Sequence, residues 1–78
     1  MKLNMEHMNR AEQVEYLKAL LPVGTRLMLK KMPNDPNPIP EGTTGTVTGI
    51  DDLGMIRMQW DNGRGLALVP NVDEFEKI

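Results

Sequence analysis

Apolar residues near the start of the chain recur at the spacing of a helix. Successive positions are three, three and four residues apart: Ala11, Val14, Leu17 and Leu21. This spacing places them on one helix face. Asn9, with Glu12 three residues later, forms a capping-box pattern, and Pro22 disfavours helical geometry at the residue before it. The pattern predicts a helix from near Asn9 to near Leu20.

Beyond Pro22, apolar and polar residues alternate in short runs, which is typical of β-strands. We predict five strands, at residues 23–32, 43–50, 55–60, 65–69 and 74–78. Turn sequences at 51–54 and 61–63 join the middle strands as hairpins. The alternation points one set of side chains inward: Leu27, Leu29, Val47, Ile56, Met58 and Trp60. Short strands with frequent turns predict a mainly β chain folded as a small five-stranded barrel.

The two parts are expected to form one domain, with a helical segment at 1–21 and a barrel at 22–78. A barrel of this size is marginally stable alone, so the apolar helix face should pack on it. Four of the six prolines lie between residues 32 and 42, where the chain joins the first two predicted strands. Because proline cannot donate a hydrogen bond to a sheet, we expect an ordered surface loop there, a usual place for binding residues.

Composition removes several kinds of chemistry from consideration. The 78 residues include no cysteine and one histidine, His7, so disulfides, thiolate zinc sites and cysteine nucleophiles are excluded. The aspartates Asp51, Asp52 and Asp61 lie in predicted turns, where such side chains bond the local backbone. This interpretation is favoured over a catalytic or metal-binding set. We therefore expect no enzymatic activity, no catalytic residue, no cofactor and no metal site.

Charge and hydropathy indicate a soluble, cytoplasmic protein. The net charge is −2, and neither a long apolar run nor a signal-peptide pattern is present. A line of basic residues, Arg26, Lys30, Lys31 and Arg57, could form a nucleic-acid face on the sheet. Scarce aromatic residues and nearby acidic turns favour an ordinary mixed-charge surface instead.

Methionine is frequent, with seven residues in the chain. Those in or next to the predicted strands are expected to pack the barrel or lie beside it: Met28, Met32, Met55 and Met58. Met5 and Met8 precede the helix and are expected to be partly exposed, in the manner of adaptable binding surfaces.

The barrel part resembles one protein family. The residues that carry the resemblance are GTTGTV at 42–47, GIDDLG at 49–54, WDNG at 60–63, LALVP at 66–70 and DEF at 73–75. They are similar to a small, functionally uncharacterised domain family found in bacteria, phages and other mobile elements. The resemblance extends from about Pro22 to the end of the chain. It implies an SH3-like barrel and carries over no activity.

A looser similarity concerns residues 65–72, which resemble the end of signalling SH3 domains. Those domains bind proline-rich peptides on a rim of aromatic side chains. Val72 stands where that pattern has a tyrosine, and the chain holds one Trp, one Tyr and one Phe. Recognition of proline-rich peptides by that route is therefore not expected.

These observations predict a small non-enzymatic interaction or accessory module that binds another protein. Two alternatives stay open: a nucleic-acid-associated SH3-like barrel, and a phage-borne inhibitor that docks on a host protein. The candidate partner-binding surface combines the proline loop with the turns expected to face it, and comprises Asn34, Asp35, Ile39, Asp61, Arg64 and Asn71.

Overall fold

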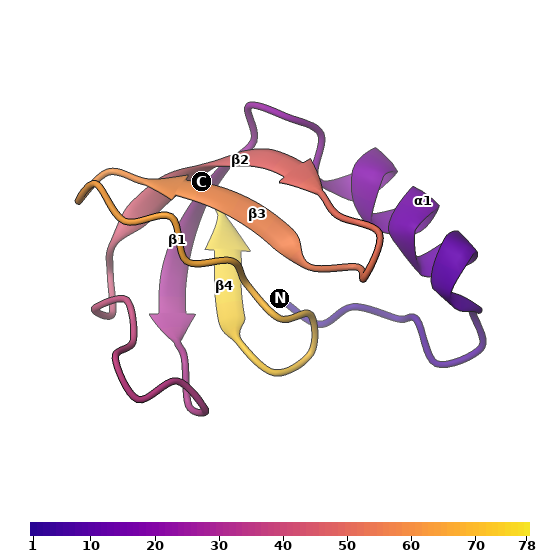
Figure 1. Cartoon of the computed structure of the whole chain (residues 1–78), viewed down its shortest axis with the longest axis horizontal. Coiled ribbons are helices and arrows are strands. Elements are labelled where there is room, and N and C mark those ends of the chain that lie inside the picture. Colours follow the sequence, from indigo (N-terminus) through magenta and orange to yellow (C-terminus); the bar gives the residue numbers. More distant parts are fainter.

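The computed structural model describes all 78 residues as one helix and one antiparallel sheet (Figure 1). In chain order the elements are α1 (Arg10–Leu20), β1 (Arg26–Lys31), β2 (Thr44–Ile50), β3 (Ile56–Trp60) and β4 (Glu74–Lys77). The strand order across the sheet is β3-β2-β1-β4. The mainly β architecture is confirmed. The sheet has four strands and does not close, so the structure does not show the expected five-stranded barrel.

The missing strand is the one predicted at residues 65–69. Only Leu68 pairs there, through an isolated bridge to Ile56. Just before it, the Leu66 carbonyl accepts a hydrogen bond from the indole Nε1 of Trp60 at 2.8 Å. No backbone hydrogen bond joins residues 65–67 to β3. The segment therefore runs beside β3 without forming a ladder.

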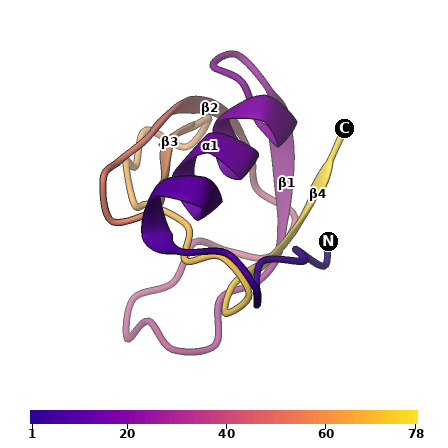
Figure 2. The ribbon, with the colours of Figure 1, turned by 90° about the vertical axis from the view of Figure 1, so that its right-hand side faces the viewer.

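Helix α1 begins and ends as the sequence predicts. Asn9 is the N-cap, and both hydrogen bonds of the capping box with Glu12 are present. The side chains of Leu17 and Leu21 are fully buried. At the other end, the Lys77 amino group donates to the Leu20 carbonyl at 3.1 Å, which satisfies one of the last free carbonyls of the helix. Figure 2 shows α1 lying across one side of the molecule, with the proline loop projecting away from it.

The inward alternation predicted for the strands is confirmed. All six predicted inward side chains are buried, and Trp60 is only 1% exposed. On the other sheet face, Thr44, Thr46 and Thr48 point outward. The close approach of β2 to Trp60 requires a glycine at position 45, because a Cβ there would lie 2.7 Å from an indole carbon.

The first residues of the chain belong to the core, which corrects the expectation that Met5 is exposed. Leu3 and Met5 are buried within the main apolar cluster, and Met8 packs partly buried against it. The terminal amino group donates to the Phe75 carbonyl in β4 at 2.8 Å. This segment thus packs beside β4 before the chain enters α1. No helix of the structure combines the length and the apolar character needed to cross a membrane.

Candidate functional site

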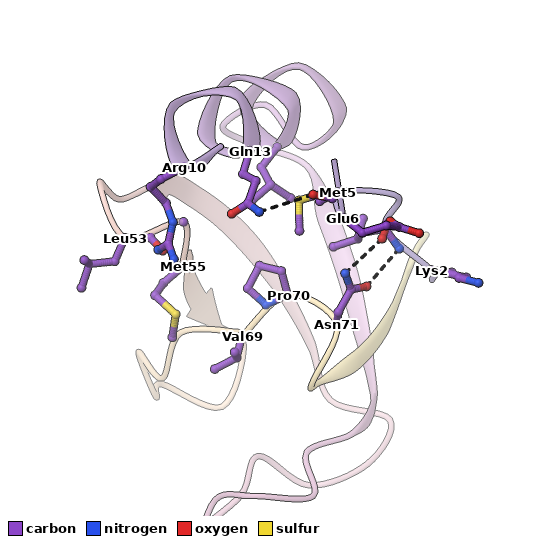
Figure 3. Close-up of a pocket in the computed structure, with 13 residues that line it drawn as sticks. Lys2, Met5, Glu6, Arg10, Gln13, Leu53, Met55, Val69, Pro70 and Asn71 are labelled. Atoms are coloured by element: carbon purple, nitrogen blue, oxygen red, sulfur yellow. Dashed lines mark hydrogen bonds between the residues drawn. The ribbon is translucent and has the colours of Figure 1, made fainter. Parts of the chain in front are cut away.

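A hollow of about 550 Å³ lies between the N-terminal segment, α1, the β2–β3 turn and the chain before β4 (Figure 3). We call it the helix hollow. Its lining residues are Lys2, Leu3, Met5, Glu6, Arg10, Gln13, Leu17, Leu53, Gly54, Met55, Val69, Pro70 and Asn71. The floor is formed by core residues such as Leu17, while the charged side chains lie at the surface. The result is an apolar floor with a polar rim, which is the usual composition of a binding site.

Hydrogen bonds hold the walls of the helix hollow in place. The Arg10 guanidinium donates to the Leu53 carbonyl, joining α1 to the β2–β3 turn. Across the hollow, the Asn71 side chain accepts from the Leu3 amide at 3.2 Å and donates to the Leu3 carbonyl at 3.0 Å. Figure 3 shows both walls, with Arg10 above Leu53 on one side and Asn71 on the other. The walls are therefore held in place by the folded chain itself.

A second, smaller hollow of about 200 Å³ lies below the proline loop. We call it the loop hollow. It is lined by Met32, Asn34, Asp35, Met55, Leu66, Ala67, Val69, Val72 and Asp73. Met55 and Val69 line both hollows. The two hollows are therefore neighbours, and we call them together the groove.

Asp51 positions the shared residue Met55. Its carboxylate accepts from the Leu53 amide at 3.0 Å and from the Met55 amide at 2.9 Å. These are the local bonds expected of an aspartate in a turn. The interpretation of Asp51 as a turn residue is confirmed. Its hydrogen bond from the Met55 amide also fixes the position of the Met55 backbone beside the groove.

Asp73 is the buried polar residue of the loop hollow, with 5% of its surface exposed. Its Oδ2 accepts from the Val69 amide at 2.8 Å. Burial raises the pKa of the Asp73 carboxyl above its ordinary value, and the nearby negative charge of Asp35 raises this pKa further. The hydrogen bond from Val69 offsets part of this shift in the pKa.

The structure distributes the six predicted surface residues over five places. Asn34 and Asp35 line the loop hollow. Ile39 is 2% exposed and belongs to the core, so its side chain is not on the surface. Arg64 donates to the Pro38 and Asn37 carbonyls at 3.0 and 2.7 Å, which fastens the turn after β3 to the proline loop. Asn71 lines the helix hollow.

Asp61 lies outside the groove, in a charged cluster with β1 and β2. Arg26 bonds both of its carboxylate oxygens, at 2.9 and 2.6 Å, and the Thr44 hydroxyl donates to one of them at 2.5 Å. The bonds from Arg26, and then the bond from Thr44, hold the pKa of Asp61 well below its ordinary value. Arg26 is thereby neutralised, which weakens the basic line considered for nucleic acid.

Several residues of the groove are not among the six candidate residues predicted from the sequence. Leu3 and Met5 alternate with polar residues, a two-residue period that indicates an extended segment with one apolar side. That signal could have placed the N-terminal segment against the core. Nothing in the local pattern indicates that Asp73 is buried, because its burial depends on the proline loop, distant in sequence. Nowhere in the chain do three His, Cys, Asp or Glu side chains gather closely enough to hold a metal ion.

Comparison with known proteins gives one match. A family described as "Domain of unknown function (DUF4314)" matches residues 10–78. No curated protein and no solved structure matches the chain. Because the match covers most of the sequence, the chain belongs to this family. The matched region contains the whole loop hollow and begins at the first residue of α1.

Proposed function

We propose that this chain is a small non-enzymatic module that binds another protein, and that the groove takes an extended segment of that partner. The observation that carries the proposal is the meeting of the two hollows at Met55 and Val69. Two neighbouring hollows with apolar floors and polar rims suit a chain that presents side chains into successive pockets.

The rigidity of the groove supports this proposal. Its walls are fastened by the bonds from Arg10 to Leu53 and from Asn71 to Leu3. Arg64 fastens the proline loop in the same way. A site built in advance loses little conformational entropy on binding, so a short partner segment can give useful affinity.

We also propose that the fold is SH3-like in the path of its chain. The strand order β3-β2-β1-β4 is supplemented by residues 64–68, which run beside β3 and touch it through the Leu68 bridge. A fifth segment that runs along this edge without a hydrogen-bonded ladder is consistent with a partly open barrel. The setting we propose is the cytoplasm of a bacterium, or of a host cell infected by a phage, on the basis of the sequence resemblance.

Random peptides displayed on phage test the proposed function. The full chain is used for selection, and each selected peptide is mapped by amide chemical shifts. We expect peptides of micromolar affinity whose shifts centre on Met55 and Val69. Met55→Glu should abolish binding, since it introduces a charge at the position shared by the two hollows.

Gln59→Glu is the matched control. Gln59 is exposed on the outer face of β3, so the same new charge there should leave peptide binding unchanged. Peptides that map to the outer sheet face, or a selection that yields none, would contradict the proposal.

A further inference from the structure

The loop hollow holds negative charge without a compensating cation. Of its nine lining residues, two are acidic, Asp35 and Asp73, and none is Lys, Arg or His. The ion pair of the structure joins Arg26 to Asp61, in a different place. A buried carboxylate is costly unless it is paired with a cation and hydrogen-bonded. Asp73 has the hydrogen bond but no cation.

One oxygen of Asp73 is available to a ligand. Only Oδ2 is bonded, to the Val69 amide. No side-chain oxygen of the structure is both fully buried and without a partner, so the unbonded Oδ1 is reached by solvent. Because Asp73 lines the loop hollow, that hollow is the route of access. Burial without a neighbouring cation also raises the pKa of the Asp73 carboxyl.

We propose that the loop hollow receives one Lys or Arg side chain of the partner protein, with its cationic head group on Asp73 and Asp35. This inference rests on the proposed function, because it assigns the chemistry of one partner side chain within the same groove. The methylene groups lie against the apolar walls formed by Leu66, Val69 and Val72. Long cationic side chains bury their stems on apolar surface in this way.

The dimensions of the loop hollow agree with such an occupant. Its volume is about 200 Å³. That space suits the stem and head group of one long side chain and is too small for a folded element. A guanidinium or ammonium on a desolvated carboxylate forms a charge-assisted hydrogen bond, stronger than a neutral one.

The test uses a pair of small probes with the full chain. The n-butylguanidinium ion represents the cationic side chain, and n-butylurea is its neutral counterpart of the same shape. Each is titrated while amide shifts are followed at Val69, Val72 and Asp73. We expect the cation to bind roughly tenfold more tightly than the urea, which corresponds to ~1.4 kcal/mol.

Asp73→Asn removes the charge and keeps an oxygen for the Val69 amide, so the fold should survive. In this variant the preference for the cation should disappear. Asp35→Asn should reduce the preference in part. Asp52→Asn, an exposed aspartate of the β2–β3 turn outside both hollows, should leave it unchanged.

Equal binding of the two probes, or a preference that persists in Asp73→Asn, would overturn the inference. So would a response to Ca²⁺ or Mg²⁺ at these amides that matches the response to n-butylguanidinium, because it would indicate a simple cation site. The proposed function is judged separately by the displayed peptides. Selected peptides that lie in the groove without a basic residue would leave the function standing and reject the cationic occupant.

Discussion

The inner face of the sheet and the groove are built from similar apolar residues but are covered to different extents. Val47, Trp60 and Leu68, on or beside the inner face of the sheet, are at most 1% exposed. Met55 and Val69, at the junction of the two hollows, are only half-buried. The first set lies between the sheet and the segments that cover it, whereas the second has no layer above it. The difference separates the part that stabilises the fold from the part that stays open to solvent.

The polar groups of the two regions differ in how completely they are paired. On the inner face, the indole N–H of Trp60 is satisfied by the Leu66 carbonyl. In the loop hollow, Asp73 is buried without a cation, and its carboxyl has a raised pKa. A buried polar group with all its hydrogen bonds formed favours the folded state. A buried charge without an opposite charge beside it opposes the folded state. Ionisation of the buried Asp73 carboxyl therefore lowers the stability of the fold.

The largest loss of stability is expected at Leu17, which the core and the groove share. Leu17 is fully buried in the core and also forms part of the floor of the helix hollow. Leu17→Ala should lower the free energy of unfolding by roughly 2–5 kcal/mol, measured by urea denaturation. Lys18→Ala, on the exposed side of the same helix, is the control. A chain beginning at Pro22 that is as stable as the whole would break the comparison, because α1 would then not be part of the core.

A smaller effect is expected where β2 approaches Trp60. Gly45→Ala places a Cβ 2.7 Å from an indole carbon and 3.1 Å from the Gln59 carbonyl. We expect a loss of about 1–3 kcal/mol in the free energy of unfolding, because the indole must shift. Gly49→Ala in the same strand meets nothing within 4 Å and should change stability much less. Equal effects of the two changes would show that the inner face is looser than the structure indicates.

The two aspartates should respond to pH in opposite directions. Asp61 has a lowered pKa in the folded state, so it stabilises the fold above its ordinary pKa and loses this contribution as the pH falls. Asp61→Asn should therefore be destabilising at pH 7, with a deficit that shrinks toward pH 3. Asp73 has a raised pKa, so its ionisation lowers stability as the pH rises.

Asp73→Asn should therefore be neutral near pH 3 and stabilising at pH 7. Thermal unfolding of both variants across this range checks the signs. A destabilising Asp73→Asn at pH 7 would mean that the carboxylate is compensated in the free protein, contrary to the comparison.

The smallest effect is expected at the rim of the groove. Leu53 is 71% exposed, and Arg10 bonds its backbone carbonyl rather than its side chain. Leu53→Ala should change the free energy of unfolding by less than ~0.5 kcal/mol. The same variant should weaken binding of a displayed peptide that passes over the β2–β3 turn. A large loss of stability would place Leu53 in the core rather than at the rim.

Local sequence predicted much of the fold. The helix from Arg10 to Leu20, its cap at Asn9 and the inward side chains of three strands follow from periodicity and capping chemistry. The predicted strand at residues 65–69 is wrong, because only Leu68 of this segment pairs with β3. The Leu66 carbonyl instead accepts from the indole of Trp60, a contact with a side chain that local sequence does not reveal. The candidate surface was predicted only in part. The loop residues Asn34 and Asp35 do line a hollow, while Ile39 is buried.

The sequence by itself determined α1, four of the five predicted strands and the inward set of side chains, because these depend on neighbours two to four residues away. Only the tertiary structure decided which loops meet. Residues 34–35 and 73 come together because β4 returns beside β1, and Met1 reaches Phe75 for the same reason. The burial of Asp73 and the shift of its pKa arise at that meeting. Desolvation is a property of the surroundings of a carboxyl, and those surroundings are assembled from residues distant in the chain.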